Sequence, residues 1–173
     1  MKKLILSLTL FLVFFSVTSQ EKERKHELKL NILTTLFTIP EIGYDYILNN
    51  DSSVGIDVLF TWNKYVGPDL DFALTPHYRY FFGNKRAAGF FLEGWSSLRA
   101  NPKEYNSYAL ILGEPYQEFS NDLDVALGIS IGGKYLLKKD FVLETFFGGG
   151  PNLIHPEYNS LALRFGVTLG KRF

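Results

Sequence analysis

The chain has 173 residues, with 18 basic and 18 acidic side chains and no cysteine. This length supports one domain, and a formal net charge of zero excludes the basic footprint that nucleic-acid binding needs. Without cysteine the chain has neither disulfides nor thiolate metal ligands.

The first nineteen residues have the pattern of a secretory signal peptide. Lys2 and Lys3 precede an apolar run over residues 4–17, and small residues come before Gln20. A run of 14 residues is too short to span a bilayer, and the basic start and small cut site are typical of an exported chain. The expected organisation is a cleaved signal peptide (residues 1–19), a short charged periplasmic lead (residues 20–27) and one barrel domain (residues 28–173).

Downstream, eight stretches carry apolar residues at every second position. Because successive side chains of a strand point to opposite faces, each stretch predicts a strand with one apolar face. Only Lys171 places a charge among these apolar positions. Pro76 lies inside the fourth stretch and has no N–H to donate to a β-ladder, so it predicts a bulge or a strand start there. In chain order the stretches are Leu28–Leu36, Ile42–Leu48, Val54–Trp62, Phe72–Phe82, Phe90–Leu98, Leu123–Ile131, Phe141–Phe147 and Leu161–Phe173.

The other parity of these strands combines small residues with charged ones. The interior of an eight-stranded barrel is just wide enough for side chains to fill it, so small residues and a few long, paired charges suit it. The bulky apolar parity would overfill that interior but fits hydrocarbon. We therefore expect an all-β fold, an eight-stranded antiparallel up-and-down transmembrane β-barrel. The alternative is a soluble barrel or sandwich with its apolar face inward.

The connections between the strands alternate in length. Short periplasmic turns with longer external loops are typical of outer-membrane barrels. The expected inner turns are Asn49–Ser53, Gly83–Ala87 and Leu137–Asp140, and the expected outer loops are Thr38–Glu41, Asn63–Leu70, Arg99–Asn121 and Pro151–Asn159.

Several short motifs mark the strands: Lys29-Leu30-Asn31, Gly43-Tyr44-Asp45-Tyr46, Arg79-Tyr80-Phe81-Phe82, Gly89-Phe90-Phe91, Gly132-Gly133-Lys134 and Gly148-Gly149-Gly150. With them the chain resembles an uncharacterised family of small eight-stranded outer-membrane barrels of Gram-negative bacteria, of the OmpA/OmpX architecture. The resemblance implies the fold, an outer-membrane location and contact with outer-membrane lipid, but no established activity. It also implies that the terminal aromatic, Phe173, is the signal read by the barrel assembly machinery.

The charges of the second parity include both signs in similar number. Buried charges are tolerated when they are paired and hydrogen-bonded, so we predict an interior ion-pair network that plugs the lumen. A selective channel would instead carry an excess of one sign along its wall. The predicted members are Lys29, Asp45, Asp57, Arg79, Glu93, Asp124, Lys134, Glu144 and Arg164.

A catalytic role was weighed on the residues near the outer rim. His155 and Glu157 lie in the fourth outer loop with Ser160 beside them, and His77 lies inside the fourth strand. Because no second carboxylate is positioned beside them, we expect loop polarity and no enzyme. The histidines have no metal-ligand spacing and there is no phosphate loop, so we expect no metal and no cofactor.

The longest outer loop, Arg99–Asn121, is rich in aromatic residues. Tyr105, Tyr108, Tyr116 and Phe119 make it a candidate contact for a surface protein, a glycan or lipid. The alternative is that the segment caps the barrel mouth or extends the fifth and sixth strands. The expected function is thus a small integral outer-membrane barrel with a structural or ligand-contacting role. The alternatives are a narrow passive pore for small solutes and a soluble periplasmic, lipocalin-like carrier of an apolar ligand.

Overall fold

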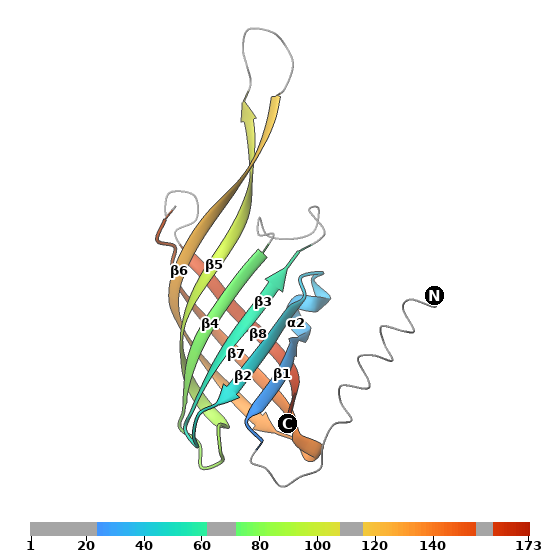
Figure 1. Cartoon of the computed structure of the whole chain (residues 1–173), viewed down its shortest axis with the longest axis vertical. Helices are drawn as coiled ribbons and strands as arrows, with labels where there is room; N and C mark the ends of the chain where they lie inside the picture. Colours follow the sequence, from blue (N-terminus) through green and yellow to red (C-terminus); the bar gives the residue numbers. More distant parts are fainter. Residues whose placement is uncertain (1–23, 62–71, 108–115, 155–160) are drawn as a thin grey trace, which may run out of the picture.

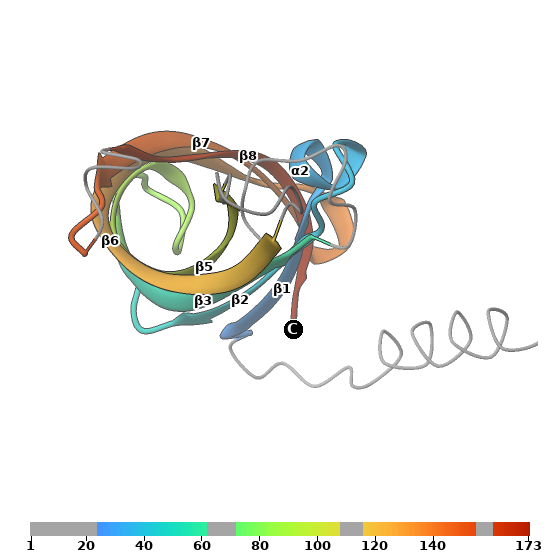
Figure 2. The same cartoon turned by 90° about the horizontal axis from the view of Figure 1, so that it is seen from above.

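Eight antiparallel strands form one closed barrel in the order β1-β2-β3-β4-β5-β6-β7-β8 (Figures 1 and 2). The computed structural model describes residues 24–61, 72–107, 116–154 and 161–173, and for residues 101–107 and 116–122 the backbone alone. The elements are β1 His26–Asn31, α2 Ile32–Leu36, β2 Glu41–Ile47, β3 Ser52–Phe60, β4 Phe72–Phe81, β5 Gly89–Ser107, β6 Tyr116–Leu136, the short 3-10 turn η1 Lys138–Asp140, β7 Phe141–Pro151 and β8 Leu161–Arg172. The predicted fold, an eight-stranded up-and-down barrel, is confirmed.

The first and last strands close the barrel. β1 pairs with β8 from Glu27 opposite Arg172 to Asn31 opposite Thr168. Beyond that ladder, the backbone N–H groups of His26 and Phe173 each donate to the other residue's carbonyl, at 3.0 and 2.8 Å. The seam therefore leaves neither strand with an open edge along this stretch. We call the end of the barrel where this seam finishes, beside the β2–β3, β4–β5 and β6–β7 connections, the turn end, and the opposite end the loop end (Figure 1).

Side chains alternate between the lumen and the outside along every strand. In β4, Ala73, Thr75, His77 and Arg79 are buried, while the residues between them are exposed or half-buried. Across the barrel the bulky apolar parity is the exposed one, and the charged parity is buried. This arrangement is the reverse of a soluble barrel, in which apolar side chains meet at the centre.

The first predicted strand is too long. It was expected to run to Leu36, but β1 ends at Asn31, and α2 occupies Ile32–Leu36. Asn31 caps this helix through its side chain, which accepts from the Thr34 N–H, and the Thr35 hydroxyl donates to the Asn31 carbonyl at 2.5 Å. These local bonds give the backbone an alternative to the ladder, so the strand stops although the apolar alternation continues.

The expected loop Arg99–Asn121 is largely strand. β5 and β6 are 19 and 21 residues long and stay paired up to Ser107 opposite Tyr116. The last β4 partner of β5 is Phe72, opposite Ala100, so the pairs beyond it form a two-stranded ribbon above the barrel (Figure 1). The alternative that this segment extends the two strands therefore holds for the described residues.

Two smaller expectations are also corrected. β1 begins at His26, so the last two residues of the predicted lead belong to the barrel. Pro76 produces neither a bulge nor a strand start: the β4–β5 register is the same on either side of it, with Leu74 opposite Leu98 and His77 opposite Trp95. Residues 1–23, with the predicted signal peptide, lie outside the described residues. Neither described helix is long and apolar enough to cross a membrane.

Candidate functional site

The candidate site is the lumen, to which all eight strands contribute charged side chains. Room for them comes from glycines on the inward parity: a Cβ at Gly43 would overlap the Asp57 carboxylate, and one at Gly55 would overlap the Asp45 carboxylate. The lumen network comprises six carboxylates, five cations and one histidine: Glu27, Glu41, Asp45, Asp57, Glu93 and Glu144; Lys29, Arg79, Lys134, Arg164 and Arg172; and His77.

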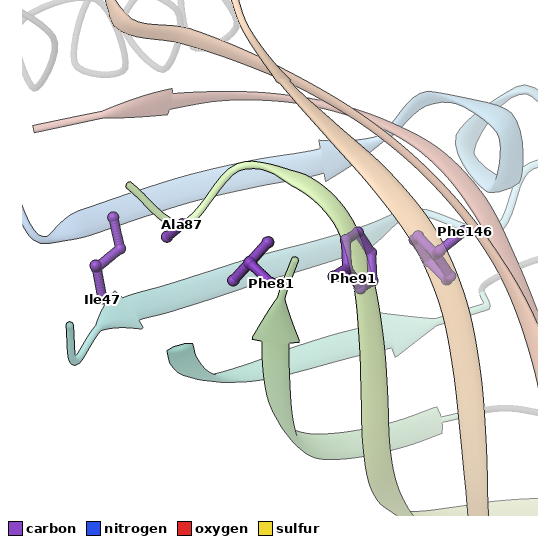
Figure 3. Close-up of a cluster of buried hydrophobic side chains, with 5 residues drawn as sticks. All are labelled: Ile47, Phe81, Ala87, Phe91 and Phe146. Carbon is purple, nitrogen blue, oxygen red and sulfur yellow. The ribbon is translucent and has the colours of Figure 1, made fainter. Parts of the chain in front are cut away.

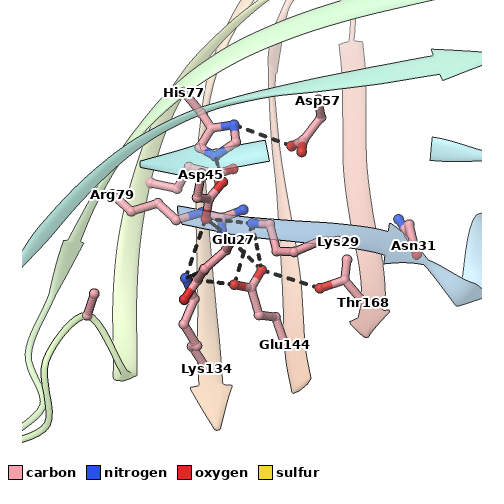
Figure 4. A network of polar contacts seen from close by, with 12 residues as sticks. Glu27, Lys29, Asn31, Asp45, Asp57, His77, Arg79, Lys134, Glu144 and Thr168 are labelled. Carbon is pink, nitrogen blue, oxygen red and sulfur yellow. Dashed lines mark hydrogen bonds and ion pairs between the residues drawn. The ribbon is translucent and has the colours of Figure 1, made fainter. Parts of the chain in front are cut away.

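The Lys134 ammonium lies at the centre of three carboxylates near the turn end (Figure 4). Its Nζ is 2.7 Å from Glu27 Oε2, 2.8 Å from Glu144 Oε1 and 3.4 Å from Asp45 Oδ2. Oxygens of these three carboxylates lie within 4.8 Å of one another, a spacing that could hold a metal ion. In this structure the protein's own ammonium neutralises them. Lys29 adds a second cation, 2.6 Å from Asp45 and 3.1 Å from Glu144.

Arg79 connects this group to the middle of the lumen. Its Nε donates to Glu93 Oε2 at 2.5 Å, and its Nη1 lies 3.0 Å from both Asp45 Oδ2 and Glu144 Oε2. The guanidinium also lies over the Phe91 ring, 4.8 Å from its centroid. A planar fork with several donors suits this role, because one side chain binds carboxylates from three other strands.

Arg164 collects the carboxylates nearer the loop end. It is paired with Asp57 and Glu93, and its Nη2 is 3.9 Å from Glu41. Glu41 in turn accepts a hydrogen bond from the Asn31 amide at 2.6 Å. Each carboxylate of this group therefore has a cationic or hydrogen-bonding partner, as buried charges require.

His77 joins the two groups of charges. Its Nε2 lies 3.0 Å from Asp45 Oδ1 and its Nδ1 lies 3.3 Å from Asp57 Oδ2, and the ring is fully buried (Figure 4). The network is therefore continuous from Glu27 near the turn end to Glu41 toward the loop end.

The turn end is closed by a salt bridge and an apolar cluster. Arg172 Nη2 is 2.7 Å from Glu27 Oε1, and the guanidinium donates to the carbonyls of Arg86 and Ala87 at 3.0 Å each. These bonds hold the β4–β5 connection against the barrel end. Beside the ion pairs lies a buried apolar cluster formed by Ile47, Phe81, Ala87, Phe91 and Phe146 (Figure 3), which reaches from Ile47 and Ala87 at the turn end to Phe146 under the Arg164 guanidinium.

A small cavity lies among these groups. The cavity lined by Lys29, Asn31, Glu41, Asp57 and neighbouring residues measures about 10 Å³. That is close to the roughly 10–15 Å³ needed for a single water molecule. Within the described residues, charged side chains from all eight strands meet in the middle of the barrel.

The structure places the predicted lumen residues unequally. Eight of the nine lie in the network, with Arg79 opposite Glu93 and Lys134 opposite Glu144 in the strand register. Asp124 is the exception: it is buried, but its Oδ1 accepts from the backbone N–H groups of Val125 and Ile154, at 2.8 and 3.2 Å.

Sequence reasoning missed four residues of the network. Glu27 was assigned to the lead and Glu41 to a loop, although both share the parity of their strand's inward residues. His77 was judged only as a catalytic or metal residue, and Arg172 was left out of the predicted network. Extending the parity by one residue before the first and second predicted strands finds Glu27 and Glu41, whereas His77 and Arg172 already lie on the inward parity of predicted strands.

The remaining predicted residues lie outside the lumen. Tyr105 is on β5, and Tyr116 and Phe119 are on β6, in the part described by backbone only, while Tyr108 lies outside the described residues. His155, Glu157 and Ser160 lie outside them as well. Phe173 is exposed and stacks on the His26 ring, with centroids 5.8 Å apart.

Comparison with known proteins agrees with the architecture. The sequence profile of a family described as "Protein of unknown function (DUF3575)" matches residues 7–166. A search of curated proteins finds no match. Among solved structures, the N-terminal β-barrel domain of OprF from Pseudomonas aeruginosa is similar, with a TM-score of 0.61 and 13% identity over 87% of this chain and 98% of that domain. At this identity the likeness shows the fold alone.

Proposed function

The chain belongs to the DUF3575 family, and we propose that it is an integral outer-membrane barrel with a closed lumen and a structural or surface-contacting role. It is neither an enzyme nor a channel in this proposal. The observation that carries it is the inverted burial: ion-paired charges fill the inside, and bulky apolar side chains cover the outside.

The outer surface supports a membrane location. Ile129 and Phe147 are 66% and 62% exposed, and apolar residues from every strand join them. Such a surface would aggregate in water, whereas hydrocarbon accommodates it, and a closed barrel leaves no unpaired edge within the bilayer. Aromatic residues gather near the turn end, as in the girdles of membrane barrels: Tyr44, Tyr80, Phe82, Phe90, Tyr135, Phe141 and Phe173.

Membrane insertion is tested with the purified chain refolded into phospholipid vesicles. The expected result is protease-resistant, vesicle-bound protein whose gel mobility shifts on heating, and the matched control is the same chain diluted into buffer without lipid. A monodisperse folded protein in buffer alone would contradict the proposal and favour a soluble carrier.

Closure of the lumen is tested by recording from the same vesicles fused to a planar bilayer. We expect no stable single-channel steps, because ion pairs and the apolar cluster of the turn end block the passage. Arg172 joins Glu27 to the β4–β5 connection, so an Arg172→Ala variant should show brief openings of the lumen as short current steps. Large, stable currents from the wild type would overturn the closed lumen and favour the passive pore.

The ribbon formed by β5 and β6 supports the surface-contacting part of the proposal. It continues seven residue pairs past Ala100, from Asn101 opposite Asp122 to Ser107 opposite Tyr116. An extended hairpin with free edges offers backbone groups to a partner strand. The test replaces residues 102–121 by a two-residue Asn-Gly turn, which joins the paired Asn101 and Asp122, and compares cross-linked neighbours in intact envelopes. Identical neighbours for both chains would end the surface-contact role.

A further inference from the structure

Two glycines on the outer face have no steric reason to be glycine. A Cβ at the lumen residue Gly128 would overlap the Trp95 ring, so glycine is needed there. At Gly94 a Cβ would meet nothing within 4 Å, and at Gly133 it would make only an ordinary contact, 3.5 Å from the Tyr135 ring. Neither has a positive φ. Glycine weakens a strand, and close approach by another molecule is one reason for such a position; of the two, only Gly133 lines a hollow that could receive one.

Around Gly133 the outer face is hollowed. The hollow measures about 480 Å³, and its lining includes Phe90, Ile131, Gly133, Thr145 and Phe147. Gly133 lies between Phe90 on β5 and Thr145 on β7, so the hollow crosses three strands. It is far larger than the ~30 Å³ share of one water molecule. Its walls carry no charged side chain, so it fits a hydrocarbon segment.

The polar groups at the turn-end side of the hollow are hydrogen-bond donors. The hydroxyls of Tyr135 and Thr145 have no hydrogen-bond partner within the described part of the chain. Lys138 and Lys139 follow in η1, exposed and without an ion-pair partner among the described residues, since the acid of this turn, Asp140, is paired with Arg24. From Tyr135 to Lys138 the chain spans at most about 10 Å.

We propose that this hollow binds one acyl chain of an anionic phospholipid. The chain lies over Gly133, the ester carbonyls accept from the hydroxyls of Tyr135 and Thr145, and the phosphate faces Lys138 and Lys139. An anionic phospholipid has its groups in this same order: the hydrocarbon chain, then the ester carbonyls as hydrogen-bond acceptors, then the negatively charged phosphate. The inference rests on the proposed function, because only a membrane-embedded barrel presents this face to lipid.

The experiment is native mass spectrometry of the barrel released from vesicles with an excess of phosphatidylethanolamine over phosphatidylglycerol. The wild type should retain one phosphatidylglycerol. Gly133→Leu places a branched side chain in the hollow where the acyl chain would lie, and should lower the retained fraction about tenfold. The matched control is Gly94→Leu, on the same face and with open space, which should retain lipid as the wild type does.

Two further variants keep the inference testable if Gly133→Leu does not fold. Tyr135→Phe with Thr145→Val removes both hydroxyls at nearly constant volume and should lower retention about fivefold or more. Lys138→Glu with Lys139→Glu should abolish the preference for phosphatidylglycerol. Failure to enter vesicles at all refutes the proposed function. Normal insertion with equal lipid retention by every variant refutes only the acyl-chain site. A wild-type dimer that Gly133→Leu converts to a monomer also refutes that site, because a second copy of the chain would then occupy the hollow.

Discussion

Replacing Arg79 by methionine removes the cation that connects most of the lumen. Its guanidinium, 1% exposed, contacts Glu93, Asp45 and Glu144 at 2.5 to 3.0 Å. Methionine keeps much of the apolar stem but none of the donors. Removing one partner of a buried ion pair costs about 3–5 kcal/mol, because a buried charge is left uncompensated.

The remaining contacts place the expected cost of Arg79→Met at the lower end of that range. Asp45 and Glu144 keep the ammonium groups of Lys29 and Lys134, and Glu93 keeps Arg164. No carboxylate is therefore left without a cation. We expect the free energy of unfolding to fall by about 3 kcal/mol.

The assay is urea unfolding in vesicles, followed by the fluorescence of the two tryptophans, of which Trp95 has a buried indole that donates to Ser130 at 2.8 Å. The matched control is Tyr80→Phe, one residue away on the opposite face, which should change the free energy of unfolding by less than about 1 kcal/mol. An Arg79→Met variant within about 1 kcal/mol of the wild type, at unchanged m-value, would refute the reasoning.

Three other substitutions test separate features. Lys134→Met leaves three carboxylates converging without their ammonium, so adding Mg²⁺ or Ca²⁺ should raise the thermal midpoint of the variant and not of the wild type; an equal response in both would count against it. Gly128→Val should prevent folding to the heat-shifted form because its Cβ would enter the Trp95 ring, while Gly94→Val folds; two folded variants would contradict the packing argument. Asn31→Ala loses the cap of α2 and the amide bond to a buried carboxylate of β2, and should lower the free energy of unfolding by about 1–3 kcal/mol in the same urea assay. No change would show that the cap is dispensable.

Most of the fold was predicted from the alternation of apolar residues with small and charged residues along each strand. A period of two decides which face each residue takes, so the inward place of Lys29 and Glu144 follows from their neighbours. Where each strand stops does not follow from parity. Asn31 ends β1 through hydrogen bonds of its own side chain, while Leu36 continues the apolar alternation without being in a strand. The ribbon was one of the alternatives for the segment Arg99–Asn121, because the sequence there has no sustained apolar alternation that would predict a strand.

The partners of the lumen charges were beyond sequence reasoning for a geometric reason. Adjacent-strand pairs such as Arg79 with Glu93 follow from counting residues from a shared turn. Contacts across the lumen depend on the stagger of the closed barrel. Asp57 is therefore bound by Arg164, 107 residues away, and not by a neighbour on β2 or β4 alone.

The even distribution of charges over the strands has a consequence for how the barrel assembles. Until β8 docks on β1, Arg164 and Arg172 cannot reach Asp57 and Glu27, and in the proposed membrane a half-wrapped sheet would expose unpaired charges to acyl tails. An incompletely closed barrel is therefore destabilised, and the more so the more ion pairs it still lacks. With the proposed membrane location, a chain paired in the wrong register would carry unpaired charges that disfavour its insertion into the bilayer.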